Sequence, residues 1–341
     1  MKRRAASLTG RLPAVLLLLL AFPLPVQAQA SEAFALALPV KCQLGVSCFV
    51  QNYVDHDPTG QVRDFMCSGR TYDGHDGTDI RIPDLQIQQG NVDVVAAAPG
   101  RVVAIRDGVD DVSIRVTGKA AVAGKECGNG IVIEHEGDWR TQYCHLARGS
   151  VRVKVGDHVV TGQSIGLVGL SGATEFPHLH FTLRHRGQIV DPFAHGAPAG
   201  ACGGGQSLWA GAIKEQTRYR AREILNFGFS SLPPTMELVE SGDLRKHPVR
   251  PESDAFSAYV RAIGLQAGDQ QTITLRGPDG TIFSEYKAEP LDRDKAQYFV
   301  ASGKRLKAAR WAPGLYKATY RVTRGEREMF GKTFEIDLGP K

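Results

Sequence analysis

The segment Phe176-Pro177-His178-Leu179-His180-Phe181 holds two histidines separated by one residue. Side chains alternate between the two faces of a β-strand, so in a strand the two imidazoles point the same way. Pro177 excludes a helix interior, and the following Phe-Thr-Leu residues favour a strand. Two imidazoles on one face can hold a divalent metal, or hold one and move protons beside it.

A second cluster lies upstream, in Gly74-His75-Asp76-Gly77-Thr78-Asp79-Ile80. The spacing of His75 and Asp79 suits one face of a helix and, being even, also one face of a strand or tight turn. Gly74 and Gly77 disfavour the helix. A histidine and a carboxylate, joined by one histidine from elsewhere, leave the fourth position of a tetrahedral zinc open, as hydrolytic sites do. Taken alone, the segment is better explained as a polar turn.

A third element, Gln142-Tyr143-Cys144-His145-Leu146, completes an ordered set. The set His75-x-x-x-Asp79, Tyr143-x-His145-Leu146 and His178-Leu179-His180 resembles the lysostaphin and LytM-type zinc metallopeptidases, which cut peptide cross-links in peptidoglycan. The resemblance covers residues 71–193. It implies a small antiparallel β-core of the duplicated hybrid motif type, with loops that form a groove.

The resemblance also implies the roles of the site residues. His75, Asp79 and His180 would bind Zn²⁺, and His145 and His178 would be catalytic histidines beside the metal. The sequence does not divide the general-base and oxyanion-stabilising roles between those two histidines. No His-Glu-x-x-His motif is present, which excludes a thermolysin-like site.

The N-terminus predicts export. Residues 1–30 combine four basic residues, a short apolar run broken by prolines, and the small-x-small sequence Ala28-Gln29-Ala30, as a cleavable signal peptide does. Removing them lowers the formal net charge from +5 to +1, so the charge does not predict nucleic-acid binding. No other apolar run is long enough for a membrane span. We expect a periplasmic protein, with an extracellular location as the alternative.

Six cysteines suggest disulfides in an oxidising compartment. The sequence contains no Cys-x-x-Cys pair, so a thiolate metal site is not expected. Fifteen connectivities are available to six cysteines. Cys127 and Cys144 flank an apparent hairpin, which favours that pair. Cys42 with Cys48 is a plausible local loop, and Cys67 with Cys202 would remain.

Short valine- and isoleucine-rich runs separated by glycine turns predict an all-β chain. They include runs at 151–155 and 236–240. We expect five parts: the signal peptide 1–30, a disulfide-containing lead-in 31–70, the peptidase domain 71–196, a glycine-rich linker 197–206, and an immunoglobulin-like sandwich 207–341. The lead-in is expected to form one wall of the groove or to cover the site in a latent form. His56, between two aspartates in the lead-in, is a further residue that could reach a metal.

The function predicted from these features is an exported zinc endopeptidase that hydrolyses peptidoglycan stem-peptide cross-links. The C-terminal domain is expected to be a structural module or to dock an envelope partner. Two alternatives stay open. One is a non-catalytic LytM-type scaffold that activates other wall hydrolases, although the retained ligands argue against it. The other is a zinc protease with a protein substrate.

Overall fold

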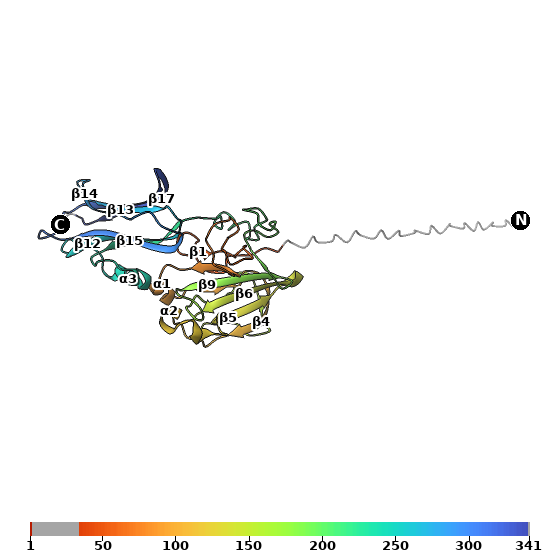
Figure 1. Ribbon diagram of the computed structural model, residues 1–341. Helices are drawn as coiled ribbons and strands as arrows, with labels where there is room; N and C mark the ends of the chain where they lie inside the picture. Colours follow the sequence, from red (N-terminus) through yellow and green to blue (C-terminus); the bar gives the residue numbers. More distant parts are fainter. Residues whose placement is uncertain (2–33, 340–341) are drawn as a thin grey trace. The chain divides into compact units, whose positions relative to one another are not determined.

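β-Strands dominate the chain, which confirms the predicted all-β class (Figure 1). The structure is a computed structural model that describes residue 1 and residues 34–339. The predicted signal peptide and its cleavage site therefore lie outside the described residues, apart from Met1. The described residues from Ala35 onward form one compact unit. Within the described residues, no helix is both long and apolar enough to cross a membrane.

The first sheet carries the predicted site. Its eight antiparallel strands run in the order β1-β2-β9-β6-β5-β4-β7, with β10 beside β9, and β9, β6, β5 and β4 lie side by side (Figure 1). A separate two-stranded sheet pairs β3 with β8. The bounds of these strands are β1 Phe49–Asn52, β2 Thr78–Arg81, β3 Asp93–Val95, β4 Gly100–Arg106, β5 Asn129–Glu134, β6 Trp139–Leu146, β7 His158–Val159, β8 Ser164–Leu167, β9 His178–His185 and β10 Gln188–Val190.

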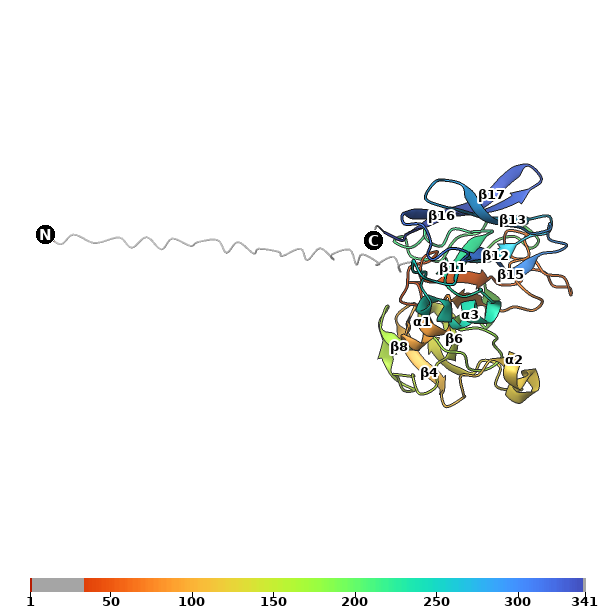
Figure 2. The same ribbon diagram turned by 90° about the vertical axis from the view of Figure 1, so that its left-hand side faces the viewer.

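The C-terminal strands form two further antiparallel sheets, visible in Figure 2. One has the order β11-β12-β15 and the other β14-β13-β16-β17. The bounds are β11 Glu223–Ser230, β12 Ala255–Leu265, β13 Gln270–Arg276, β14 Ile282–Lys287, β15 Lys295–Arg305, β16 Leu315–Arg324 and β17 Arg327–Asp337. Buried and exposed residues alternate along β13 and β16, as expected for strands with one face on a core. The immunoglobulin-like topology and the domain boundaries stay predictions.

Strand β12 is buried along its whole length because both its faces are covered. Phe256 and Val260 pack into the core between the two C-terminal sheets. On the opposite face, Tyr259 packs against Val239 and Leu244. Its sequence lacks the polar alternation of a half-exposed strand, because only Ser257 and Arg261 interrupt an otherwise apolar run.

The helices are short. Their bounds are α1 Leu85–Gln89, α2 Ile114–Thr117 and α3 Met236–Ser241, with 3₁₀ turns η1 Lys119–Val122, η2 Glu136–Asp138 and η3 Asp243–Lys246. The strand predicted at 236–240 is therefore wrong. Thr235 caps a helix there, because its hydroxyl accepts a hydrogen bond from the Leu238 N–H.

The strand predicted at 151–155 is also wrong. Side chains take the backbone donors that a ladder would need: Asp107 accepts from the Val151 N–H and Asp157 accepts from the Lys154 N–H. Strand β15, which the sequence analysis did not predict, pairs with β12 from Ala255 to Leu265. Its sequence mixes apolar and polar residues without strict alternation, and the pairing with β12 stabilises it as a strand.

The structure contains three disulfides, and they are the three pairs named from the sequence: Cys42–Cys48, Cys67–Cys202 and Cys127–Cys144. The Cys67–Cys202 bond joins the lead-in to the predicted linker. The Gly203 N–H also donates to the Phe65 carbonyl, at 2.6 Å. The glycine-rich segment is thus fastened to the lead-in by a covalent bond and a hydrogen bond.

The disulfides differ in the length of chain they close, so their removal should differ in cost. Cys67–Cys202 spans 135 residues and Cys42–Cys48 spans 6. Loop entropy predicts that replacing the first pair by serines lowers the free energy of unfolding by about 2–3 kcal/mol more than replacing the second. Urea denaturation of the two double variants measures the difference, and equal losses would contradict this explanation.

Candidate metal centre

The three predicted ligands converge on one point. Strands β2 and β9 are paired so that Asp79 lies opposite His180, on the same face. His75 lies in the turn before β2. Its Nε2 is 3.2 Å from His180 Nδ1 and 3.2 Å from Asp79 Oδ1, and His180 Nδ1 is 2.9 Å from Asp79 Oδ1. These are the three donor atoms that could hold a metal ion.

The size of this triangle fits a tetrahedral metal. Zinc bonds to imidazole and carboxylate of about 2.0–2.2 Å give ligand–ligand edges of roughly 3.3 Å in a tetrahedron. The observed edges of 3.2, 3.2 and 2.9 Å lie close to that value. Three protein ligands in such a site leave the fourth position free.

The outer nitrogens of both ligand histidines are fixed by acceptors. His75 Nδ1 donates to the Tyr53 carbonyl at 2.6 Å. His180 Nε2 lies 3.1 Å from Asp76 Oδ1 and 3.0 Å from Thr182 Oγ1, and the carboxylate can only accept. Both inner nitrogens are then lone-pair acceptors directed at each other and at a carboxylate. A cation between them removes this repulsion.

Electrostatics also favours a cation here. Burial raises the pKa of Asp79, but the neighbouring His75 and His178 outweigh it and hold that pKa well below its usual value. Burial lowers the pKa of His180, but the hydrogen bonds to Asp76 and Asp79 outweigh it and raise the pKa to about 9.

His145 and His178, the predicted catalytic histidines, lie beside the ligands. Their rings are 4.7 Å apart, and His178 Nε2 is 3.3 Å from Asp79 Oδ1. His145 Nδ1 donates to the Ser171 carbonyl at 2.7 Å, and His178 Nδ1 to the Phe176 carbonyl at 2.9 Å. A carbonyl can only accept, so each Nδ1 carries the proton and each Nε2 keeps a basic lone pair. Burial, followed by the nearby His178 and His180, lowers the pKa of His145 well below its usual value, which keeps it neutral at pH 7.

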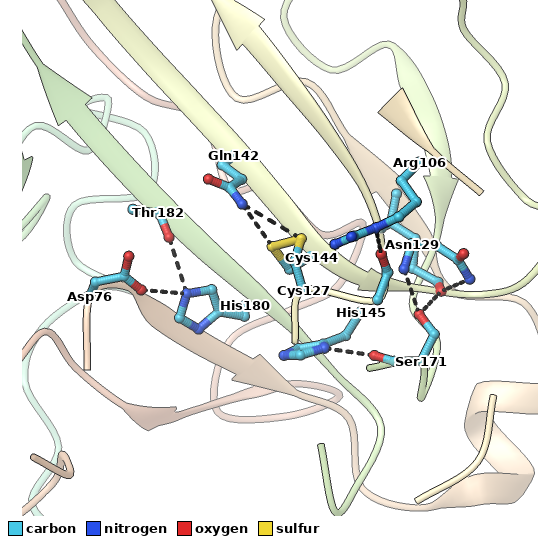
Figure 3. The surroundings of a disulfide bond; sticks show 12 residues. Asp76, Arg106, Cys127, Asn129, Gln142, Cys144, His145, Ser171, His180 and Thr182 are labelled. Carbon is cyan, nitrogen blue, oxygen red and sulfur yellow. Dashed lines mark hydrogen bonds and ion pairs between the residues drawn. A yellow bond between two sulfur atoms is a disulfide. The ribbon is translucent and has the colours of Figure 1, made fainter. Parts of the chain in front are cut away.

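The backbone at His145 is held in a conformation that is rare for histidine, with φ of 63°. Its N–H donates to the Cys127 carbonyl at 2.8 Å, and the disulfide from Cys127 to the adjacent Cys144 fixes the same two segments (Figure 3). The Ser171 backbone that receives the imidazole is held in turn by Asn129, whose N–H donates to Ser171 Oγ at 2.9 Å (Figure 3). This network positions the His145 imidazole.

Three positioning residues were missed by the sequence analysis. Asn52, in strand β1, donates its amide N–H to Asp79 Oδ2 at 2.8 Å, which leaves Oδ1 to face the metal point. Tyr53 follows it and supplies the carbonyl for His75. Asp76 accepts from His180 and also receives Arg184 at 2.9 Å. Asp76 could have been found, because it lies between His75 and Asp79 in the sequence. Asn52 lies 27 residues from Asp79, and no local sequence pattern indicates it.

Gly77 has a steric role beyond disfavouring a helix. A Cβ at this position would lie 2.7 Å from His180 Nε2 and 2.8 Å from the Phe181 carbonyl oxygen. Only glycine lets the turn approach the ligand so closely. His56, by contrast, does not reach the metal point: its Nε2 pairs with Asp191 Oδ2 at 2.8 Å.

Comparison with known proteins places this site in a recognised segment. Residues 73–192 match peptidase family M23. Two *Vibrio cholerae* proteins are similar over part of their length. Peptidoglycan DD-endopeptidase ShyA is 41% identical over 71 residues, which are 21% of this chain and 16% of ShyA. Peptidoglycan DD-endopeptidase ShyB is 42% identical over 76 residues, which are 22% of this chain and 17% of ShyB.

The matched segment thus spans less than a fifth of the length of these two relatives. Among solved structures, a zinc-containing peptidase from *Vibrio cholerae* is 27% identical, with a TM-score of 0.27, over 42% of this chain and 39% of that one.

Asp76 should matter for metal affinity although it is not a ligand. Partners that orient a ligand histidine are worth about 10–100-fold in affinity or activity, so Asp76→Ala should weaken zinc binding by that factor. Asp76→Asn, which keeps an oxygen acceptor, should lose less. Competition with a chromogenic chelator measures both, with Asp73→Ala as the exposed neighbouring control. Equal zinc affinity in Asp76→Ala and the parent would contradict the role.

Proposed function

We propose that the protein is an exported zinc endopeptidase that cuts peptide cross-links of peptidoglycan, and that residues 73–192, which match peptidase family M23, form its catalytic domain. The observation that carries the proposal is the convergence of His75 Nε2, Asp79 Oδ1 and His180 Nδ1 on one point, with edges of about 3 Å. His145 and His178 stand beside that point, each with its Nδ1 held by a backbone carbonyl.

His75, Asp79 and His180 would hold the zinc. A zinc ion in such a site supplies Lewis acidity, which polarises a carbonyl and brings the pKa of water from 15.7 to about 7. The chain's own contribution is proton transfer. A neutral imidazole with a fixed Nδ1–H can accept a proton at Nε2 and deliver it to the leaving amine. The second imidazole can then donate to the oxygen on which charge develops. Either His145 or His178 fits each role.

The substrate follows from the relatives. The two named relatives are peptidoglycan DD-endopeptidases by name, which supports a D-alanyl-diaminopimelate cross-link over a glycine bridge. The signal-like composition of residues 1–30 supports export to the periplasm, where this substrate would be met. The C-terminal sheets would serve as a module that positions the enzyme or docks a partner in the envelope.

The metal and the catalytic histidines can be tested separately. The purified protein should contain about one zinc per chain, and chelation should abolish cleavage. His180→Ala should lose the zinc. His178→Ala should keep the zinc and lose cleavage by about 10²–10⁴-fold, the usual worth of a general acid–base group. His158→Ala, at an exposed position in β7, is the control. Unchanged cleavage in His180→Ala with zinc still bound would overturn the ligand assignment.

The bond cut can be read directly. Mass spectrometry of muropeptides after digestion should show cross-linked dimers converted to monomers, because only the cross-link is hydrolysed. A zinc-loaded His178→Ala sample is the matched blank. Casein offered in parallel distinguishes a general protease: digestion of casein with intact muropeptide dimers would favour a protein substrate instead.

A further inference from the structure

A small cavity lies beyond His178, on the side where the first sheet meets the C-terminal strands. Its volume is about 170 Å³, several times the roughly 30 Å³ that a water molecule occupies. The lining comes from both the peptidase segment and the C-terminal strands. Its charged members are Arg81, Asp84, Arg115, Glu175, Glu240 and Arg261.

Arg81 connects this cavity to the candidate catalytic centre. It lies on β2 directly opposite His178 on β9, two residues beyond the ligand Asp79. Its guanidinium carbon stands 4.0 Å from the centre of the Phe176 ring, and that ring is 4.9 Å from the His178 ring. One aromatic ring therefore separates the guanidinium from the histidine that would move the proton.

The charge of Arg81 is poorly compensated. The residue is 1% exposed, and its Nη1 donates to two neutral acceptors, Gln51 Oε1 at 2.7 Å and Gln297 Oε1 at 3.3 Å. Its buried Nε has no hydrogen-bond partner. Among residues 34–339, no carboxylate forms an ion pair with it.

The acidic groups around the cavity are engaged elsewhere. Glu175 and Glu240 both pair with Arg115, at 3.0 and 2.9 Å. Asp84 receives both terminal nitrogens of Arg245, at 2.6 and 2.7 Å.

The remaining guanidinium of the cavity, that of Arg261, is fully buried and lies 3.4 Å from Glu240. Of the three guanidiniums that line the cavity, Arg81 alone forms no ion pair with a carboxylate among the described residues. A buried cation of this kind is unfavourable unless an anion joins it.

We propose that this cavity is a subsite for a free carboxylate of the stem peptide, within one residue of the bond that is cut. The inference rests on the proposed function and deepens it. Guanidinium groups recognise carboxylates through paired hydrogen bonds. In a D-alanyl-diaminopimelate cross-link, the carbon that bears the scissile amide nitrogen also carries a free carboxylate. A glycine bridge has no such group, so the subsite would select the first substrate.

Two synthetic cross-linked peptides test the subsite on the zinc-loaded full-length protein. One carries the free carboxylate beside the scissile amide and the other a carboxamide. The parent enzyme should cleave the carboxylate peptide with a kcat/KM about tenfold higher or more, as expected for a charge-assisted contact. Arg81→Gln should cleave the two peptides at rates within about twofold of each other, with zinc content and thermal stability measured alongside.

A second pair of variants keeps the test valid if Arg81→Gln fails to fold. Val116 lines the cavity and is 80% exposed, so substitution there leaves the core untouched. Val116→Asp should lower kcat/KM for the carboxylate peptide by roughly threefold or more relative to Val116→Asn, because like charges repel. The two variants should cleave the carboxamide peptide equally well.

The outcomes separate the two proposals. Equal cleavage of both peptides by the parent enzyme overturns the carboxylate subsite and leaves the endopeptidase function standing. Failure to cleave either peptide or whole peptidoglycan, with zinc bound, overturns the function itself. A preference for the carboxylate that Arg81→Gln retains in the folded state assigns recognition to other residues and also overturns the subsite.

Discussion

The site depends on two inward-facing imidazole lone pairs that meet beside a carboxylate. His75 and His180 are turned that way by acceptors on their outer nitrogens, the Tyr53 carbonyl and the Asp76 carboxylate. Without a positive charge at its centre such an arrangement is unfavourable, because the lone pairs of the two nitrogens, 3.2 Å apart, repel each other. The geometry of a cation site is therefore fixed by hydrogen bonds to the outer nitrogens of the two histidines.

Strand pairing supplies the remaining precision. The register of β2 with β9 sets Asp79 opposite His180 and Arg81 opposite His178. A one-residue slip would send every one of these side chains to the opposite face. Strand β1 pairs with β2 at the same place, where Asn52 lies opposite Asp79. The pair Asp79–His180 and the pair Arg81–His178 thus lie on one face of the two strands, with only the pair Ile80–Leu179 between them.

Sequence alone indicated what is local or periodic. The His178-Leu179-His180 alternation, the even spacing of His75 and Asp79, and the pairs Cys42–Cys48 and Cys127–Cys144 follow from short-range rules. The pair Cys67–Cys202 was left by elimination. The all-β class followed from valine-rich runs between glycines. Asn52 could not be found, because its partner is distant in the chain and an asparagine carries no pattern. Strand β15 and helix α3 were missed for a related reason: tertiary pairing overrode composition in one, and a threonine cap decided the other.

Strand β1 shows that the segment defined by sequence similarity and the structural unit around the site differ in extent. The recognised family segment begins at residue 73, yet the carbonyl that orients His75 and the amide that orients Asp79 belong to residues 53 and 52. The same stretch is tied to residue 202 by a disulfide. A fragment that keeps the candidate ligands His75 and Asp79 oriented must therefore include residues before the family segment, and the disulfide extends this unit beyond residue 192. A fragment cut at the boundaries of the family match would lack the residues that orient His75 and Asp79.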